Sequence, residues 1–398
     1  MKKLLHIILL LPLIILIGCV PSSNTDPMAL PEENPEDAAN QELASKPPLA
    51  PEPTPPLTPK PTPPPEPTPE PTPEPTPEPT PEPPSAFGFI DAHADTISRA
   101  LLPKHNAGLY SNDLHIDFAR LSEFEAPVQV FVLWLSDSYL SSAFERTNYM
   151  IDFFESEVEK HKDLIEIALD LEDIRRIARE GKISAILSIE GGEALMGKIE
   201  NLDHFYNRGV RILAPTWNRE NELGYGQATG SAKGLKPFGI ECIKRMDELG
   251  MIMDVSHLNE AGFWDAHSTG TRPYMASHSN AYAVMPHNRN LKDDQIMAIV
   301  ERGGVIGFNM FPLIVAPNEK ADMDDIMKHF RHFINTGAGN HIGLGCDFDG
   351  IPSTPKGITD VSSLKAFGEL LTTEFDEETS FRIMEGNFYE FFERYFED

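Results

Sequence analysis

The chain has 398 residues, enough for one large domain or two ordinary ones. Its formal net charge of −29 argues against nucleic-acid binding, because contacts to phosphates need clustered lysine and arginine. Apart from Cys19, only Cys242 and Cys346 are present, which give no disulfide framework and no indication of a cysteine zinc site.

Residues 1–19 resemble a bacterial lipoprotein signal peptide. Two lysines precede a short apolar run, which leads into Leu16-Ile17-Gly18-Cys19. A charged start, an apolar stretch and a small residue before the cut describe a secretory signal, and the run is too short for a membrane span. Cleavage before Cys19 would leave a lipidated cysteine, which predicts an extracytoplasmic protein anchored to a bacterial membrane. The alternative is a plain signal peptide or short anchor in which Cys19 is incidental.

Residues 20–85 are predicted to be a disordered linker rich in proline, threonine and glutamate. From Glu66 to Glu82 the motif Glu-Pro-Thr-Pro repeats, which favours a stiff polyproline II stalk rising about 3.1 Å per residue. We expect a spacer that holds the following domain away from the membrane. A proline-rich ligand for a binding module is the alternative, although the repeat lacks a basic flank.

Residues 86–398 alternate short apolar runs with amphipathic segments, which predicts an α/β fold. The runs have the continuous apolar character of parallel strands buried on both faces. We therefore predict one (β/α)₈ TIM barrel, with an open doubly wound sheet as the alternative. The strand candidates are Phe87–Ile90, Val128–Leu135, Ile183–Ile189, Val210–Ala214, Met251–Val255, Tyr274–Ser277, Val305–Met310 and Ile342–Gly345, and the helix candidates include Thr147–Lys160, Leu235–Leu249, Leu291–Glu301 and Asp322–Ile334.

Ligand-type side chains recur where five of these strands end, which is where a barrel builds its active site. Each motif is weak alone, since a lone histidine at a strand end is more often structural and Asp-x-Asp-Gly is often only a turn. Together they indicate a metal centre, because imidazole and carboxylate groups suit zinc. The segments are Asp91-Ala-His93-Ala-Asp95, Glu190-Gly-Gly, Asp254-Val-Ser-His257, Ser277-His278-Ser and Gly345-Cys-Asp347-Phe-Asp349-Gly.

These motifs in this order, followed through Arg289-Asn290, resemble the membrane dipeptidase (renal dipeptidase) family over about Phe89 to Asp360. The resemblance implies a barrel of the metal-dependent hydrolase type, with a binuclear zinc centre that hydrolyses dipeptides. Members can accept a D-residue at the C-terminal position, and some open β-lactam rings. It also brings homodimers into consideration, for which the sequence offers no independent indication.

The resemblance also implies a role for each residue. His93 and Asp95 would bind one zinc ion, His257 and His278 would bind the other, and Glu190 would bridge the two. Two ions that share a water can make it hydroxide near neutral pH, and a nearby carboxylate must then pass a proton to the leaving amine. Asp347 would be that proton-transfer group. Arg289 would hold the free carboxylate of the substrate with its planar guanidinium.

One position departs from the family pattern. Where many members have a histidine that contacts the substrate, this chain has Trp217, within Leu213-Ala-Pro-Thr-Trp-Asn218. Either Trp217 faces the substrate and favours small or apolar dipeptides, or it packs under the loop and leaves Asn218 or Asn221 to face the substrate. The departure affects substrate range and efficiency but not metal binding.

Two other functions remain alternatives. One is a binuclear hydrolase of lactones, lactams or N-acyl amino acids, although a neutral substrate would not explain Arg289. The other is a non-catalytic surface binding protein, which the full ligand set together with Asp347 argues against. His287, next to Arg289, is undecided. The remaining histidines, at positions 105, 115, 161, 204, 267, 329, 332 and 341, are interpreted as surface or packing residues.

Overall fold

The computed structural model describes residues 88–397, except for 103, 106 and 318–319. Cys19, the predicted signal and the predicted stalk lie outside the described residues, so lipidation and the polyproline spacer stay predictions. None of the helices in the described part is long and apolar enough to cross a membrane.

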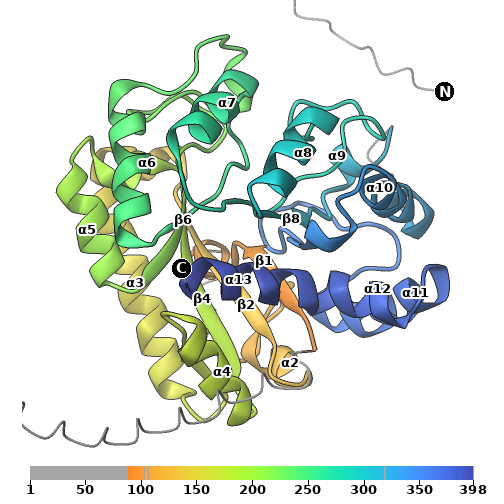
Figure 1. Cartoon of the computed structure of the whole chain (residues 1–398). Helices are drawn as coiled ribbons and strands as arrows, with labels where there is room; N and C mark the ends of the chain where they lie inside the picture. The colour runs from red at the N-terminus through yellow and green to blue at the C-terminus, as the bar shows by residue number, and fades with distance from the viewer. Residues whose placement is uncertain (1–87, 103, 106, 318–319, 398) are drawn as a thin grey trace, which may run out of the picture. The chain divides into compact units, whose positions relative to one another are not determined.

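The strands form one closed parallel barrel (Figure 1). Eight of them follow the order β6-β5-β4-β2-β1-β9-β8-β7, and β3 pairs with β4 outside this path. A parallel bridge between Asp254 and Met275 joins the two ends of the path, which excludes an open doubly wound sheet. The strands are β1 Ile90–Ala94, β2 Val128–Trp134, β3 Ile165–Ile167, β4 Ile183–Glu190, β5 Val210–Ala214, β6 Ile252–Met253, β7 Met275–Ala276, β8 Val305–Phe308 and β9 Ile342–Leu344.

Alternate residues along the strands pack into different layers, as the two-residue period of a strand requires. In β2, Val130 and Val132 belong to the cluster inside the barrel, whereas Phe131 and Leu133 pack into the layer beneath the helices. In β4, Ile186 belongs to the inner cluster. Glu190 is four residues further along the same strand, so its side chain points toward the barrel interior at the carboxyl end.

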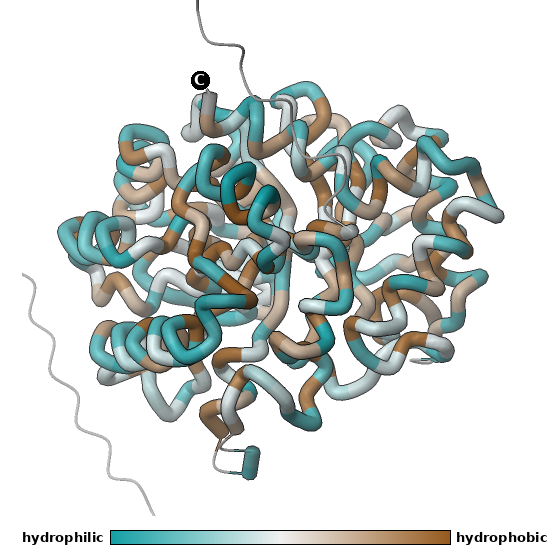
Figure 2. The backbone as a smooth tube through the Cα atoms, turned by 90° about the horizontal axis from the view of Figure 1, so that it is seen from below, coloured by the Kyte–Doolittle hydropathy of each residue, from teal (hydrophilic) through white to brown (hydrophobic). Residues whose placement is uncertain are grey.

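Helices surround the barrel and cover the outer faces of the strands (Figure 1). In Figure 2, hydrophilic stretches lie along much of the outer helical surface, while hydrophobic stretches recur toward the interior. The helices are α1 Thr96–Ala100, α2 Phe118–Leu121, α3 Ala143–Lys160, α4 Leu171–Arg179, α5 Ile199–Asn207, α6 Pro237–Leu249, α7 Glu260–Thr269, α8 Asp293–Glu301, α9 Pro312–Val315, α10 Met323–Asn335, α11 Leu364–Glu374, α12 Glu377–Phe381 and α13 Asn387–Glu397.

The last helix closes the end of the barrel opposite to the carboxyl ends of the strands. Phe388, Phe391 and Phe392 of α13 belong to the inner cluster, together with Ile90 and Val128 at the starts of their strands. The Asn387 amide donates hydrogen bonds to the carbonyl oxygens of Gly339 and Ile342 at the start of β9. The side chains of α13 therefore fill the amino-terminal end of the barrel interior.

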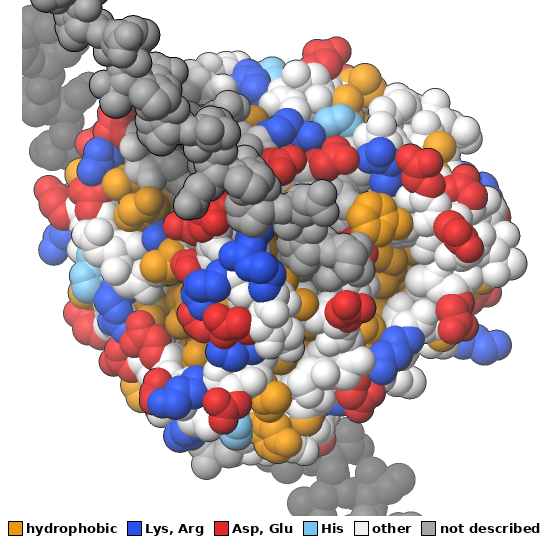
Figure 3. All heavy atoms as spheres, turned by 60° about the horizontal axis from the view of Figure 1, so that its bottom comes forward, with side chains coloured by type: hydrophobic (Ala, Val, Ile, Leu, Met, Phe, Trp, Pro, Cys, Tyr) orange, Lys and Arg blue, Asp and Glu red, His pale blue; other side chains and the backbone are white. Residues whose placement is uncertain are grey.

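Charged side chains on the surface pair locally with charges of opposite sign. On the face in Figure 3, lysine and arginine side chains lie beside acidic ones. Arg176 contacts Asp173 at 2.9 Å and Glu166 at 2.5 Å, and Lys182 contacts Glu180 at 2.6 Å. Such exposed pairs contribute little to stability, about 0–1 kcal/mol each.

The predicted barrel is confirmed, with differences at the ends of elements. The first strand begins at Ile90 and extends to Ala94, so His93 lies inside the strand that we expected it to follow; the predicted start at Phe87 lies outside the described residues. The short strand β3 was not predicted, because Ile165–Ile167 offers only three residues and an alternating pattern. The predicted helices begin or end within a few residues of α3, α6, α8 and α10.

Candidate metal centre

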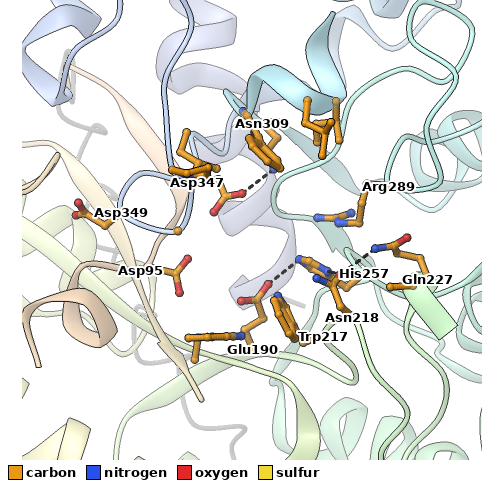
Figure 4. A pocket seen from close by; sticks show the side chains of 18 of the residues that line it. Asp95, Glu190, Trp217, Asn218, Gln227, His257, Arg289, Asn309, Asp347 and Asp349 are labelled. Atoms are coloured by element: carbon orange, nitrogen blue, oxygen red, sulfur yellow. Dashed lines mark hydrogen bonds and ion pairs between the residues drawn. The ribbon is translucent and has the colours of Figure 1, made fainter. Parts of the chain in front are cut away.

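The five predicted ligands lie together at the carboxyl ends of four strands. β1 carries His93 and leads into Asp95, and Glu190 is the last residue of β4. His257 and His278 follow β6 and β7. All five are buried. Figure 4 shows the carboxylates of Asp95 and Glu190 directed with the ring of His257 toward one common space.

The Glu190 carboxylate is the centre of this arrangement. Its Oε1 lies 2.9 Å from Nε2 of His257, 3.5 Å from Nε2 of His278 and 3.8 Å from Nε2 of His93. On the other side, Nε2 of His93 lies 3.5 Å from Oδ2 of Asp95. Ligands of one tetrahedral zinc ion lie about 3.4 Å apart, which follows from bond lengths of about 2.0–2.2 Å. These separations therefore fit shared metal coordination.

The ligand atoms divide into two groups, each compact enough to hold one ion. One group contains Glu190, His257 and His278, and the other contains His93, Asp95 and Asp347. This division agrees with the predicted pairs, and Glu190 is placed so that it can contact both groups. Asp347, predicted as a proton-transfer group, therefore lies close enough to His93 and Asp95 to share an ion with them.

Unpartnered buried atoms show that the residues present fit a pair of cations. In the described part of the chain, Nε2 of His93, Oδ1 of Asp95 and Oε1 of Glu190 are buried without a hydrogen-bond partner. Nε2 of His257 also lies only 2.9 Å from Nε2 of His278. Burial lowers the pKa of both histidines well below 6.5, helped by the positive charge of Arg289. Two neutral ring nitrogens this close together can both bind the same metal ion.

The carboxylates also make the site attractive to positive charge. Burial alone would lower the pKa of His93, but Glu190, Asp95 and Asp347 outweigh it and raise the pKa to about 10. The pKa of Glu190 is itself raised well above 4.5, first by burial. The negative charges that favour a protonated His93 would also attract a divalent cation, and the cation would reduce the repulsion among these acids.

The backbone around the centre adopts conformations that side chains rarely tolerate. Among the described residues, five non-glycine residues have a positive φ, and three of them are His257 (70°), Asp347 (59°) and Asp349 (68°). Such conformations cost of order 1–3 kcal/mol each and persist where surrounding contacts impose them. Their concentration here marks the site as the strained part of the barrel.

Asp347 is partly buried at the edge of the centre and is held by Asn309. The Asn309 amide donates a hydrogen bond to Oδ2 of Asp347 at 3.0 Å (Figure 4). Burial raises the pKa of Asp347 to about 7, and Asp95 adds to the rise, while His93, Asn309 and Arg289 act in the opposite direction. A carboxyl group with such a pKa can both take up and release a proton near neutral pH.

Asp349 lies in the turn that Asp-x-Asp-Gly suggested, but its side chain also joins separate segments of the chain. Its carboxylate is buried and accepts hydrogen bonds from Oγ1 of Thr96 at 2.6 Å and from the backbone N–H groups of His115 at 2.7 Å and Ile116 at 3.3 Å. Its own N–H donates to Nδ1 of His115 at 3.0 Å. Asp349 therefore ties the segment around His115 and the end of β1 to the loop that carries Asp347.

Arg289 and the metal centre line one cavity of about 580 Å³. Arg289 is 9% exposed, and its Nη2 donates a hydrogen bond to the carbonyl oxygen of His278 at 3.2 Å. No ion pair to a carboxylate is found for it among the described residues. His287 also lines the cavity, and its Nδ1 accepts a hydrogen bond from the backbone N–H of Arg289 at 3.2 Å. The guanidinium is thus available to a ligand.

Trp217 lines the same cavity and at the same time packs against Trp134. The two rings meet edge to face with centroids 5.1 Å apart, and the Arg219 guanidinium lies 4.9 Å from the Trp217 ring. The two alternatives for Trp217 are therefore combined, since it packs on one side and faces the cavity on the other (Figure 4). Asn218 also lines the cavity, whereas Asn221 is not among the residues that line it.

Several residues behind the ligands were not assigned from the sequence. Asn218 accepts hydrogen bonds from Nδ1–H of His257 and from the Gln227 amide, both at 2.8 Å. Gly226 makes this possible, because a side chain there would collide with the carbonyl oxygen of Trp217. Asp254 and Ser277 stand in the motifs quoted above, and their position directly before a ligand-bearing segment was the available signal. Asn309 follows β8 and could have been found in the same way.

The sequence matches the family described as "Membrane dipeptidase (Peptidase family M19)" over residues 85–395. The chain is similar to Dipeptidase tcpJ of Claviceps purpurea (strain 20.1), with 31% identity over 261 residues. The matched region covers 62% of this chain and 61% of that protein, so the chain spans about three fifths of the length of this relative.

Two solved structures share the barrel. The crystal structure of "the dipeptidase AC, Metallo peptidase" has a TM-score of 0.73 and 26% identity, and the match covers 79% of this chain and 100% of that one. A metallo peptidase from Rhodobacter sphaeroides, liganded with a phosphinate mimic of the dipeptide L-Ala-D-Ala, has a TM-score of 0.72 and 25% identity. That match covers 78% of this chain and 99% of the other.

Proposed function

Because the chain belongs to the membrane dipeptidase family, peptidase family M19, we propose that it hydrolyses dipeptides by means of two zinc ions. The observation that carries the proposal is Arg289, a buried guanidinium that opens into the cavity beside the ligand groups. A fork of donors matches a carboxylate. A free C-terminus fixed at this point, close to the metals, selects very short peptides.

The two ions would be held by the residues that the centre brings together. His93 and Asp95 would bind one ion, His257 and His278 the other, and Glu190 both. When bound, the zinc ions would polarise the scissile carbonyl and supply hydroxide as the nucleophile near neutral pH. Glu190 would contribute to both sites, because its Oε1 lies within 3.8 Å of the ring nitrogens on both sides.

Asp347 would carry the proton between the nucleophile and the leaving amine. Its carboxylate lies within ligand distance of His93 and Asp95, and its raised pKa suits a group that must both accept and donate. The hydrogen bond from Asn309 leaves one carboxylate oxygen for this transfer. Arg289 meanwhile would keep the substrate from turning, so that the amide nitrogen stays within reach of Asp347.

The cavity favours dipeptides with apolar side chains. Trp217 and Trp134 form one wall, and the cavity is also lined by Phe311, Leu313 and Ile351. Burying an aliphatic or aromatic side chain there stabilises a complex by about 25 cal/mol per Å² of apolar surface. The L-Ala-D-Ala mimic bound by the Rhodobacter sphaeroides relative supports a D-residue at the C-terminal position as a further substrate feature.

The test is hydrolysis of a dipeptide series by the purified protein before and after chelation. We expect about two zinc ions per chain, loss of activity on chelation, and recovery with added zinc. Blocking the C-terminus as an amide should abolish cleavage in the wild type. Arg289→Ala should raise KM for the free dipeptide, with Arg245→Ala, a surface substitution, as the matched control. Cleavage of lactones or lactams in preference to every dipeptide, or activity that survives exhaustive chelation, would overturn the proposal.

The proposed location is the outer side of a bacterial membrane, with the lipid on Cys19. Two acyl chains give stable anchoring where one does not. Cys19→Ala should release the protein from the membrane fraction or block its processing, with Cys242→Ala as the control. A Cys19→Ala protein that is still membrane-bound and normally cleaved would contradict lipidation.

A further inference from the structure

Ser277 lies behind the metal centre, between two of its histidines. The Ser277 hydroxyl oxygen is 2.7 Å from Nδ1 of His278 and 3.2 Å from Nδ1 of His93. It is also 2.5 Å from Oδ2 of Asp254. All four side chains are buried, so water cannot replace these contacts.

Asp254 determines the direction of the hydrogen bond that Ser277 donates. Its Oδ1 accepts the backbone N–H groups of Ser256 and Ser277, each at 2.9 Å, which orients the carboxylate. The competing acceptors are Nδ1 of His278 at 2.7 Å, Nδ1 of His93 at 3.2 Å and Oγ of Ser256 at 3.5 Å, and all three are neutral atoms. Because a short bond to a charged carboxylate is stronger than a bond to a neutral acceptor, the single Ser277 proton points at Asp254.

The two lone pairs of the Ser277 hydroxyl determine which ring nitrogen of His93 and of His278 carries the hydrogen. A serine hydroxyl has one donor and two lone pairs. With its proton on Asp254, Ser277 can only accept from His93 and His278, so both rings carry hydrogen on Nδ1. Their Nε2 atoms are then bare, and these are the atoms that face Glu190 at 3.8 and 3.5 Å.

We propose that Ser277, oriented by Asp254, is one positioning residue that sets the ring tautomer of a ligand in each half of the binuclear centre. His93 belongs to one group of ligands and His278 to the other. The inference rests on the proposed metal binding. It makes the two sites interdependent, because a single hydroxyl prepares a nitrogen for each of them.

Asp254, His93 and His278 could also be considered a third metal site, since their ligand atoms lie within 4.8 Å of one another. The hydrogen bonds exclude this alternative. The nitrogens that face Asp254 are the Nδ1 atoms, and the Ser277 hydroxyl already lies between them and the carboxylate. The cluster therefore supports the two sites and does not bind an ion itself.

Ser277 is also held rigidly by the fold. Asp254 makes the bridge to Met275 that closes the barrel between β6 and β7. Gly345 at the end of β9 approaches so closely that a side chain there would collide with the Ser277 carbonyl oxygen. Ser277 and Asp254 thus lie where β6 and β7 close the barrel, and backbone from three strands limits their movement.

His257 provides an internal comparison because its Nδ1 contacts Asn218 and not Ser277. Its Nδ1–H donates to Oδ1 of Asn218, whose second lone pair accepts from the Gln227 amide. Asn218 therefore performs for one histidine what Ser277 performs for two. A variant at Asn218 should affect only the ion held by His257 and His278, whereas a variant at Ser277 should affect both ions.

Asp254→Asn is the sharpest test, because the side chain keeps its size while one carboxylate oxygen, an acceptor, is replaced by an NH₂ group, a donor. An amide NH₂ facing Ser277 would turn the hydroxyl proton toward a histidine, whose hydrogen must then move to Nε2. We expect the affinity for both zinc ions, measured by chelator competition on the full-length protein, to fall by about 10–100-fold. Ser277→Ala should do the same, and Asn218→Ala should weaken one ion only.

Nitrogen-15 spectra of the histidines give a second readout that a loss of packing would not reproduce. In the zinc-loaded wild type, His93, His257 and His278 should carry hydrogen on Nδ1. In Asp254→Asn, one of the two rings at Ser277 should show hydrogen on Nε2. A wild type that binds two ions while Asp254→Asn and Ser277→Ala bind them equally well would refute the inference alone. A wild type that binds no metal would instead refute the proposed function.

Discussion

Asn309 donates its hydrogen bond to one oxygen of Asp347 and leaves the other oxygen directed toward the space between the ligands. This contact joins the end of β8 to the loop after β9. It also lowers the pKa of a carboxyl group that burial has raised to about 7, so Asn309 moderates the rise.

Asp347→Asn should remove most turnover and leave the metals in place. An amide cannot take up and return a proton, and general acid–base groups typically contribute about 10²–10⁴-fold in rate. The measurement is kcat together with the zinc content of the same sample. Loss of an ion along with activity would show that Asp347 acts as a ligand of the group that contains His93 and Asp95.

Asp349→Asn is the matched substitution two residues away, and it should mainly cost stability. The Asp349 carboxylate accepts three hydrogen bonds in a buried place, and an amide would leave a donor facing a donor there. The expected loss is about 1–3 kcal/mol in the free energy of unfolding, measured by chemical denaturation. Turnover should fall far less than in Asp347→Asn. Equal losses of turnover at the two positions would show that their roles are assigned wrongly.

Trp217→His should broaden the range of dipeptides and raise turnover. The indole fills part of the cavity and cannot titrate, whereas an imidazole can donate a hydrogen bond to a developing oxyanion. A tenfold rise corresponds to about 1.4 kcal/mol of transition-state stabilisation. kcat/KM for small and bulky side chains should be compared, with Trp264→His as the control outside the cavity. Lower stability with unchanged specificity would assign Trp217 to packing alone.

His329 should make the fold sensitive to acid. The ring is fully buried, its Nδ1 accepts the N–H of Ala281, and its Nε2–H donates to the carbonyl oxygen of Val315. Burial lowers its pKa from 6.5 to about 4. Between these values the unfolded chain binds the proton and the folded chain does not, so stability falls as the pH drops from 6.5 toward 4.

The size of this effect is about 3 kcal/mol, from about 1.36 kcal/mol per pKa unit. His329→Gln should flatten the part of the pH dependence of unfolding that lies in this window. His332→Gln, on the same helix but partly exposed, is the control. A wild type whose unfolding free energy is the same at pH 5 and pH 7 would contradict the buried neutral ring.

The barrel and its ligands could be predicted because both leave periodic signals. Continuous apolar runs such as Val128–Trp134 indicate buried parallel strands, and polar residues at their ends have few structural reasons to be there. Glu190 and His278 were therefore placed correctly at strand ends from position alone. The burial of the Asp349 carboxylate was not predicted, because Asp-x-Asp-Gly has the composition of a turn and the partners of that carboxylate come from a segment more than two hundred residues earlier.

The roles of the supporting residues could not be predicted for a related reason, although the position of Ser277 directly before His278 was a signal. Asn218 and Ser277 act through hydrogen bonds that depend on which atom faces which, and the sequence does not carry this information. Trp217 shows a different limit. Its identity was evident, but whether its ring packs or faces the cavity depends on Trp134, which lies on another strand.

The closure of the barrel by α13 has a consequence for synthesis of the protein. The aromatic residues that fill the amino-terminal end of the barrel leave the ribosome after all of the barrel strands. Until Phe388 to Phe392 have emerged, the apolar interior faces of the first strands have no partner to cover them. A nascent chain of this protein therefore cannot complete its core until α13 has been synthesised, and a product stopped short of Asn387 would present that interior to chaperones and proteases.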